Sequence, residues 1–236
     1  MPDNTLAVVF VSYLKVPVER LMDHFRWNED VYASFGDRLR VYVVSDVDHE
    51  LPSDATCVVF PLDRLPMIQC RRRFSLTQTK NAGIQRAIAD GCDVIVATDV
   101  DIVLPRPLVA RMFNVTEQQA VIPVYLMAED FVTRYKGHLD HGCTGTVAMT
   151  AANWKRIPYD EECVEYGGDD GILLRDIERA GLGIQRDKIV SHIAHVPGDG
   201  ERTPGRGADT CWGREDGFNR DNFRKNRRLH RARGRR

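Results

Sequence analysis

The sequence predicts an α/β protein in which a mostly parallel central sheet is flanked by helices. Short apolar runs rich in β-branched residues, typical of strands buried on both faces, alternate with longer segments of helical periodicity. A strand, a helix and a second strand in this order form a right-handed crossover unit of a parallel sheet. The chain has 236 residues, of which 43% are apolar, so one sizeable core is expected.

The first strand is expected near the N-terminus, where Leu6 begins an apolar run that ends at Ser12. The later strands are similar short runs of apolar and β-branched residues. Together the strands are expected at residues 6–12, 41–45, 57–60, 94–97, 120–126, 147–149 and 189–190.

Apolar residues at helical spacing predict the helices between these strands. Pro17 begins the first helix, in which Val18, Leu21, Met22 and Phe25 recur at i, i+3, i+4 and i+7 and so form one core-facing stripe. Further helices are expected at residues 79–91 and 172–181, each ending at a glycine, and from the prolines at 105 and 107 onward.

Composition indicates a soluble, cytoplasmic protein. No window approaches the ~20 apolar residues that a transmembrane helix needs, and the N-terminus does not resemble a signal peptide. The 6 cysteines are scattered without a Cys-x-x-Cys pair, which favours reduced thiols over disulfides or a zinc knuckle. The formal net charge is −1, which gives the chain as a whole no attraction to nucleic acid or membranes.

Two carboxylates follow the strand that begins at Val94. Asp99 and Asp101 lie one residue apart where this strand ends, so we expect them on the same side of the pleat. Their repulsion would favour a divalent cation beside them. An Asp-x-Asp triplet arises by chance about once in such a chain, and a second spans Asp46 and Asp48. Asp46 ends the second strand, where doubly wound sheets bind a base or ribose, whereas the pair after Val94 ends a more central strand.

Four short motifs occur in an order and spacing that is more specific than any one of them. They are Lys80-Asn81-x-Gly83-x-x-x-Ala87, Thr98-Asp99-Val100-Asp101, Tyr166-Gly167-Gly168-Asp169-Asp170 and Ser191-His192-Ile193-Ala194-His195-Val196. Over nearly its whole length, to about residue 200, the chain resembles the nucleotide-sugar glycosyltransferases of the Rossmann-like GT-A fold. The last two motifs look most like those of β-1,4-galactosyltransferases and polypeptide N-acetylgalactosaminyltransferases, although Asp169 stands where that branch has Glu.

The resemblance implies a hexosyltransferase-like enzyme that moves a sugar from a nucleoside diphosphate-sugar, expected to be a UDP-sugar, to an acceptor hydroxyl. Mn²⁺ or Mg²⁺ would neutralise the departing diphosphate, and a carboxylate and imidazole ligand set favours Mn²⁺ over Ca²⁺. By resemblance, Asp101 and His195 are the metal ligands, and Asp99 contacts the ribose or the metal with its water. Asp170 would be the general base of an inverting transfer, and Asp169 would hold acceptor or sugar hydroxyls.

Further donor contacts are expected around this centre. Ser12 and Asp46 end neighbouring strands and are placed to contact the base or ribose. Arg73, Lys80 and Asn81 are candidates for the diphosphate. A solvated run of charge explains Arg73 and Lys80 equally well.

The C-terminal part is rich in glycine, proline and charge. Residues 197–217 follow His195 and are expected to close as a lid over the donor, with Trp212 covering the sugar; a plain connector is the alternative. The catalytic domain is therefore predicted to span residues 1–218. Residues 219–236 form a strongly basic tail, which either docks an anionic acceptor, such as nucleic acid or a cell-surface precursor, or is a disordered solubilising end.

Other functions remain open at this stage. A haloacid-dehalogenase-like phosphatase would use Asp99 as nucleophile and Asp169 or Asp170 to hold Mg²⁺. Three predicted strands precede the strand that leads to Asp99, whereas that family's nucleophile lies on its first strand. A nucleic-acid-binding protein on a transferase-like fold would act through the basic tail. The acids also have purely structural explanations. Asp99 and Asp101 could belong to a turn, where Asp is common, and Asp169 and Asp170 could be acids that favour a helix N-terminus.

Overall fold

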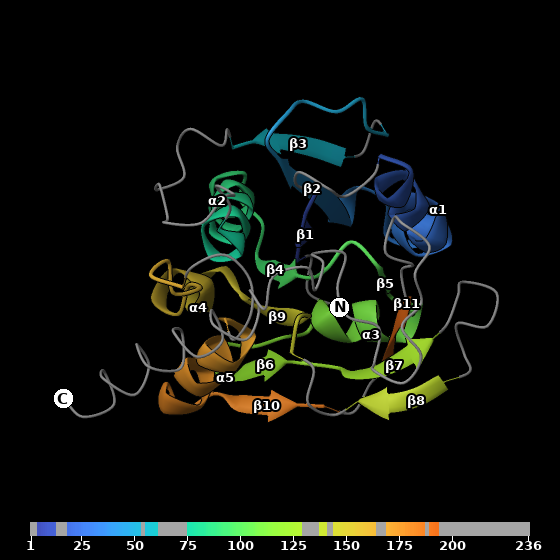
Figure 1. Cartoon of the computed structure of the whole chain (residues 1–236). Helices are drawn as coiled ribbons and strands as arrows, with labels where there is room; N and C mark the ends of the chain where they lie inside the picture. Colours follow the sequence, from blue (N-terminus) through green and yellow to red (C-terminus); the bar gives the residue numbers. More distant parts are fainter. Residues whose placement is uncertain are drawn as a thin grey trace, which may run out of the picture.

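The computed structural model describes residues 4–12, 18–52, 55–60, 75–128, 137–140, 144–163, 169–186 and 189–193. Their elements alternate between strands and helices, as the sequence predicts (Figure 1). In chain order they are β1 (Leu6–Val11), α1 (Val18–Phe35), η1 (Gly36–Arg38), β2 (Leu39–Ser45), β3 (Ala55–Val59), α2 (Leu76–Ala89), β4 (Val94–Ala97), β5 (Ile102–Val103), α3 (Arg106–Met112), β6 (Gln119–Val121), β7 (Val124–Ala128), β8 (Gly137–Asp140), β9 (Val147–Thr150), α4 (Ala151–Arg156), α5 (Asp169–Arg179), β10 (Gly183–Gln185) and β11 (Ile189–Ile193).

Seven strands form the main sheet in the order β10-β6-β9-β4-β1-β2-β3. The four strands β3, β2, β1 and β4 run parallel, and Leu6 of β1 lies opposite Leu39 of β2 and Val94 of β4. Strand β9 runs antiparallel to both β4 and β6. The predicted mostly parallel α/β sheet is therefore confirmed. Because β1, β2 and β4 are parallel, their carboxyl ends meet at one edge, the usual position of a ligand site in such sheets.

A second sheet has the order β5-β11-β7-β8. The single strand predicted at residues 120–126 is wrong, because β6 belongs to the main sheet and β7 to the second one. Ile122 and Pro123 separate them, and a proline has no N–H with which to continue a ladder. Strand β11 runs antiparallel to β5, with His192 opposite Ile102. The second sheet thus brings the last described strand beside the residues that follow Asp101.

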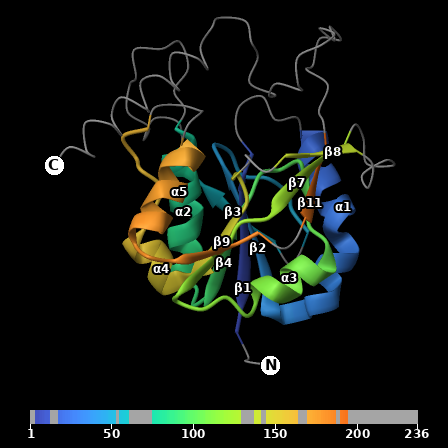
Figure 2. The ribbon, with the colours of Figure 1, turned by 90° about the horizontal axis from the view of Figure 1, so that it is seen from below.

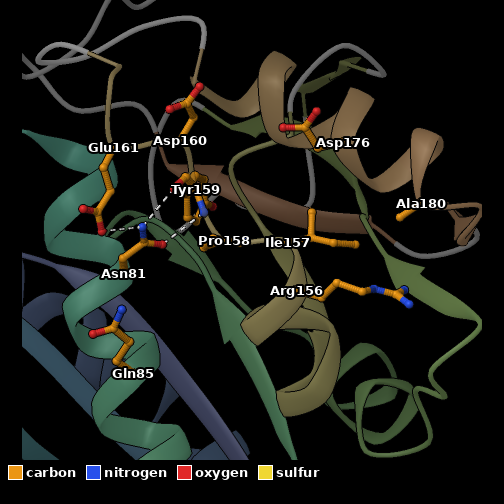
Figure 3. Close-up of a pocket in the computed structure, with 10 residues that line it drawn as sticks. All are labelled: Asn81, Gln85, Arg156, Ile157, Pro158, Tyr159, Asp160, Glu161, Asp176 and Ala180. Atoms are coloured by element: carbon orange, nitrogen blue, oxygen red, sulfur yellow. Dashed lines mark hydrogen bonds between the residues drawn. The ribbon is translucent and has the colours of Figure 1, made fainter. Parts of the chain in front are cut away.

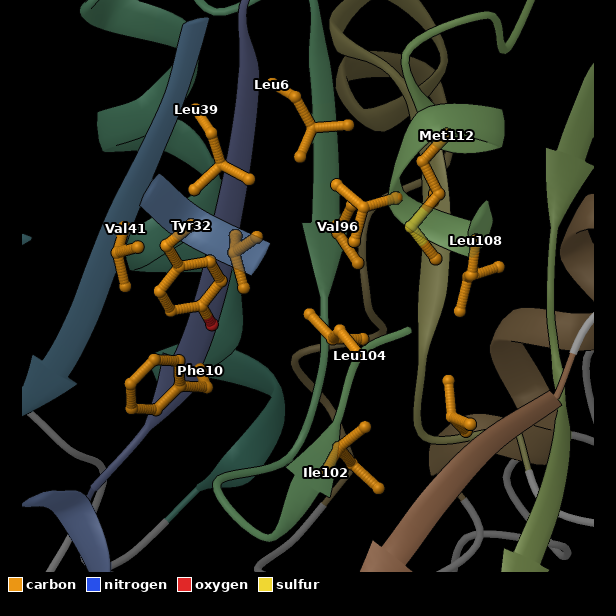
Figure 4. Close-up of a cluster of buried hydrophobic side chains, with 14 of the residues drawn as sticks. Leu6, Phe10, Tyr32, Leu39, Val41, Val96, Ile102, Leu104, Leu108 and Met112 are labelled. Atoms are coloured by element: carbon orange, nitrogen blue, oxygen red, sulfur yellow. The ribbon is translucent and has the colours of Figure 1, made fainter. Parts of the chain in front are cut away.

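Helices cover both faces of the main sheet, with α2, α4 and α5 on one side and α1 and α3 on the other (Figure 2). Successive residues of β1 alternate between the two cores, since Val9 packs in the cluster beneath α2 and Phe10 in the cluster beneath α1. Figure 4 shows part of this second cluster, which includes Leu6 and Phe10 of β1 and Tyr32 of α1. None of the described helices is long and apolar enough to cross a membrane.

The buried stripe of α1 differs from the predicted one. Val18 is 51% exposed and Met22 is 38% exposed, so their predicted place in the core is wrong. The helix instead buries Leu21, His24, Phe25, Asn28 and Tyr32, which also follow helical spacing. Two of these five side chains are polar, and both form hydrogen bonds with the segment after β4. Sequence hydrophobicity therefore identified the helix and two of its buried residues, Leu21 and Phe25, but not the polar part of its inner face.

Candidate active site

The site lies at the carboxyl edge of the main sheet, in the turn that follows β4. Strand β4 ends at Ala97, and Thr98 N donates a 2.9 Å hydrogen bond to Val9 O. Asp99 and Asp101 follow in a turn, with Ile102 N donating to Asp99 O at 3.4 Å. Because both acids lie beyond the strand, the alternation of a pleat does not set their directions, and that part of the prediction is corrected.

Lys80 of α2 reaches this turn from the core. Its side chain is 1% exposed, and Nζ lies 3.2 Å from Asp99 Oδ1. Burial alone would lower the pKa of Lys80, but the negative charge of Asp99, with further contributions from Asp170 and Asp169, raises the pKa well above its usual value. Lys80 is therefore a buried cation, and the alternative of a solvated surface charge is wrong for it.

Gly83 explains how α2 comes so close to the sheet. A Cβ atom at this position would lie 2.5 Å from side-chain carbons of both Val9 and Val44. Only glycine avoids this overlap, so the helix packs directly on β1 and β2. The Lys80–Gly83 motif thus sets the depth at which Lys80 meets Asp99.

Asp169 and Asp170 begin α5 and face the same buried cation. Asp169 is 5% exposed, and Asp170 Oδ1 is buried with no hydrogen-bond partner among the described residues. Burial raises the pKa of Asp170 to about 8, with further increases from Asp169 and Asp99 that Lys80 partly offsets. The negative charges of three carboxylates therefore act on one ammonium group, and the excess negative charge favours either a protonated Asp170 or an added cation.

A glycine and threonine segment fixes the other side of Asp99. A Cβ atom on Gly145 would collide with Asp99 Oδ2 and would approach Tyr125 Oη to 3.0 Å. Thr146 Oγ1 lies 2.8 Å from both Thr98 Oγ1 and Tyr125 Oη. Sequence reasoning missed Gly145, Thr146 and Tyr125. The run of Gly and Thr at residues 142–146 is the signal that could have found the first two.

Asn81, which was predicted to contact the donor, uses its amide to hold the chain after α4. Its Oδ1 accepts a 3.0 Å hydrogen bond from Tyr159 N, and its Nδ2 donates at 2.9 Å to Tyr159 O and to Glu161 Oε1. Tyr159 in turn carries Lys80 Nζ over its ring, 5.3 Å from the ring centre. Asn81 therefore supports a wall of the Lys80 site, and its contact with a diphosphate stays a prediction.

A cavity of about 630 Å³ lies between α2, the end of α4 and α5 (Figure 3). Tyr159 lines the cavity and also packs against Lys80. The cavity therefore lies beside the Lys80 site, but neither Asp99 nor Asp170 lines it. Its lining is Asn81, Gln85, Arg156, Ile157, Pro158, Tyr159, Asp160, Glu161, Asp176 and Ala180.

Ser12 and Asp46 lie at the same edge of the sheet as Asp99, at the ends of β1 and β2. Ser12 is buried, and its N–H donates a 2.8 Å hydrogen bond to Val44 O. Asp46 is half-buried beside Ser45, whose Oγ also lies 2.9 Å from His49 Nε2. The sheet thus brings these two predicted donor contacts to the expected edge. Arg73, His195, Trp212, the expected lid at 197–217 and the basic tail at 219–236 lie outside the described residues, so the domain boundary at 218 also stays a prediction.

The described residues supply only part of a metal site. Asp101 is 5% exposed and the side chain of Asp99 is 35% exposed, and both carboxylates follow β4 at the edge of the sheet. Within the described ranges, no three His, Cys, Asp or Glu side chains converge to hold a metal ion. Strand β11 ends at Ile193, two residues before His195, and His192 lies opposite the residue that follows Asp101. The donor set and the excess negative charge fit a divalent cation.

Several solved structures with this architecture are glycosyltransferases. The catalytic domain of Drosophila β1,4-galactosyltransferase 7, in complex with xylobiose, superimposes with a TM-score of 0.55 and 17% identity over 87% of this chain and 75% of that one. The chain has the GT-A glycosyltransferase fold. No protein-family model and no curated protein sequence matches the chain, so the likeness is one of structure.

Two further GT-A structures are similar to this chain. A mannosyltransferase from Pyrobaculum calidifontis, in complex with GDP-mannose and Mn²⁺, has a TM-score of 0.55 and 16% identity, covering 82% of this chain and 58% of that one. Glucosyl-3-phosphoglycerate synthase from Mycobacterium tuberculosis, in complex with phosphoglyceric acid, has a TM-score of 0.52 and 15% identity over 82% and 73% of the two chains. At these identities the GT-A fold is common to all three, and the function of this chain has to be argued from its own residues.

Proposed function

We propose that this protein is a metal-dependent glycosyltransferase that transfers a hexosyl group from a UDP-sugar to an acceptor hydroxyl with inversion at the anomeric carbon. The observation that carries the proposal is the contact of Asp99 with the buried Lys80 at the carboxyl edge of a GT-A sheet, where the charges of Asp170 and Asp169 also act on the lysine. Similar structures contain GDP-mannose with Mn²⁺, or manganese with UDP-galactose, which supports a nucleoside diphosphate-sugar as the donor.

Asp101 and His195 would hold the cation, with Asp99 beside them. A bound Mn²⁺ or Mg²⁺ would supply Lewis-acid neutralisation of the departing diphosphate. Three carboxylates against one ammonium group leave net negative charge, which is costly to keep from solvent without a further cation. Lys80 is engaged by Asp99 in this structure, so its contribution to donor binding runs through that carboxylate.

Asp170 is the proposed general base. The acceptor oxygen attacks the anomeric carbon as the bond to the diphosphate oxygen breaks, and the hydroxyl proton passes to Asp170. Its buried Oδ1 has no hydrogen-bond partner among the described residues and is thus available to accept that proton. A pKa of about 8 is suited to proton transfer near neutral pH, and a nearby divalent cation would lower this pKa and so favour the carboxylate. Asp169, one residue before, would hold acceptor or sugar hydroxyls.

Thermal unfolding with a panel of UDP-, GDP- and dTDP-sugars, each with and without Mn²⁺, tests the proposal. A donor at 100 times its dissociation constant should add about 2.7 kcal/mol to the free energy of unfolding, and only when Mn²⁺ is present. The same samples are then assayed for slow release of UDP by donor hydrolysis. A panel in which no nucleotide-sugar raises the melting temperature in a metal-dependent way would overturn the proposal. Phosphate release from a general phosphomonoester would instead favour the phosphatase alternative.

A further inference from the structure

Helix α1 forms hydrogen bonds with the backbone of the turn that contains the proposed metal ligands. His24 Nδ1 lies 2.9 Å from Val100 O, the carbonyl between Asp99 and Asp101. Asn28 Nδ2 donates a 3.0 Å hydrogen bond to Ile102 O, and Asn28 Oδ1 accepts one of 2.7 Å from Leu104 N. Both side chains are 0% exposed. One face of α1 therefore binds main-chain groups of three alternate residues of this segment, Val100, Ile102 and Leu104.

The hydrogen-bond pattern fixes the tautomer of His24. A carbonyl oxygen only accepts, so Nδ1 carries the proton and donates it to Val100 O. His24 Nε2 must then accept, and the hydroxyl of Tyr32, 2.7 Å away, donates to it. The ring also packs against Phe10, with 4.0 Å between ring centres. The imidazole is neutral, because burial lowers its pKa to about 4. Its ring is thus oriented from both nitrogens and from one face.

Packing alone does not require polar residues at these two positions. A leucine would fill the core under α1 without needing a hydrogen-bond partner, whereas a buried imidazole or amide is costly unless every polar atom is satisfied. The partner here is irregular backbone. Residues 98–101 lie outside any strand, and β5 is only two residues long, so the main-chain groups of this segment need partners from elsewhere.

We propose that His24 and Asn28 are positioning residues that hold the turn from Asp99 to Leu104 in the conformation that divalent metal and nucleoside diphosphate require. This inference rests on the proposed function, because it assigns the residues a role through Asp99 and Asp101. Neither side chain is proposed to touch the donor. Tyr32 has a supporting role, because its hydroxyl donates to His24 Nε2 and so keeps the ring proton on Nδ1, which faces Val100.

The test uses the full-length chain with two probes, Mn²⁺ alone and Mn²⁺ with UDP, and follows bound Mn²⁺ by electron paramagnetic resonance. His24→Leu removes the donor to Val100 O, and His24→Asn keeps an N–H donor at nearly the same place. We expect His24→Leu to weaken Mn²⁺ binding by about tenfold, the lower end of the loss that follows removal of a direct partner of a metal ligand, because His24 acts on the backbone between the two aspartates. His24→Asn should recover most of that loss. Amide exchange should rise at residues 98–104 in the leucine variant only.

Tyr42→Phe is the matched control. Tyr42 is buried in β2, and its hydroxyl donates to Asp90 at 3.1 Å, a contact that does not involve residues 98–104. The Tyr42→Phe variant should be somewhat less stable in urea and should bind both probes as the unmodified protein does. Equal losses of Mn²⁺ affinity in Tyr42→Phe and His24→Leu would reduce the role of His24 to general stability and overturn the inference.

The remaining outcomes separate the inference from the function on which it rests. If folded His24→Leu binds both probes normally, the positioning role is wrong and the proposed function stands. If the unmodified protein binds neither probe, both fall. If His24→Leu does not fold, Tyr32→Phe decides, because it removes only the hydroxyl that orients the imidazole. Reduced Mn²⁺ affinity in folded Tyr32→Phe supports the inference, and unchanged affinity overturns it.

Discussion

Lys80 Nζ lies 3.2 Å from Asp99 Oδ1, although Lys80 is on a helix in the core and Asp99 is in the turn at the edge of the sheet. The lysine is 1% exposed and the aspartate 35% exposed, so the pair spans the boundary between the interior and the site. A buried ammonium group fixes the direction of a carboxylate that solvent, metal or donor can still reach. This pair links the fold to the proposed chemistry, because α2 approaches the sheet closely only through Gly83.

Replacing Lys80 should destabilise the protein. Lys80→Met removes the only cation that the described residues place among Asp99, Asp169 and Asp170. Breaking a fully buried pair costs about 3–5 kcal/mol, but the exposure of Asp99 reduces this, and we expect a loss of about 2 kcal/mol in urea unfolding at pH 7. Lys155→Met, on the exposed side of α4, should change stability by less than about 0.5 kcal/mol. Equal effects in the two variants would contradict the structural importance of the pair.

Asp170→Asn should abolish transfer without weakening donor binding. An amide has the shape of the protonated carboxyl but cannot accept the hydroxyl proton, so kcat should fall by about 10²–10⁴. The measurement is the steady-state rate of UDP release with acceptor, alongside the Mn²⁺-dependent binding of UDP, which should be unchanged. Glu178→Gln, an exposed change on the same helix, is the control and should have normal activity. An active Asp170→Asn variant would assign the base to another group.

The pattern of apolar runs was sufficient for most of the main sheet, although its edge strand β10 was not predicted. Strands β1, β2 and β4 are buried on both faces, so their sequences are continuously apolar and easily recognised. The position of Asp99 after β4 followed directly. The division of residues 120–126 between two sheets was not predictable, because it depends on where β11 pairs with β7, far along the chain.

The polar contacts of the site were less predictable, because each depends on a partner from a distant segment. Lys80 looks like a surface residue until Asp99 is placed beside it. His24 and Asn28 interrupt an apolar stripe, and no local pattern shows that their partners are carbonyl groups after β4. Gly145 is a small residue in a loop until Asp99 packs against it.

Alanine substitutions at three glycines should have three different effects, which follow from the space around each position. Gly83→Ala would place a methyl group 2.5 Å from Val9 and Val44 and should cost about 1–3 kcal/mol of stability through overpacking. Gly171→Ala meets nothing within 4 Å on α5 and should stabilise the helix by about 0.5–1 kcal/mol. Gly145→Ala collides with Asp99 Oδ2, so it should weaken Mn²⁺ and UDP binding more than it changes stability.

Urea unfolding and Mn²⁺ binding, measured on all three variants, separate these effects. Gly171→Ala is the control for adding a methyl group where there is space. A Gly145→Ala variant that binds Mn²⁺ normally would show that Asp99 can move without loss, and would contradict its proposed place beside the metal.

His24 should make the stability of the protein fall with decreasing pH. Its pKa is about 4 in the folded protein and 6.5 when unfolded, so the unfolded chain binds the additional proton between these values. The contribution of the neutral imidazole is therefore complete above pH 6.5 and is lost as pH falls toward 4, amounting to about 2 kcal/mol at pH 5. Urea unfolding at pH 7.5 and pH 5 measures this loss of stability. His24→Asn is the control, because asparagine does not titrate and the carboxyl groups contribute equally to both proteins. If the two proteins lose the same stability over this interval, His24 does not have the lowered pKa, and its neutral tautomer with Nδ1 facing Val100 would have to be abandoned.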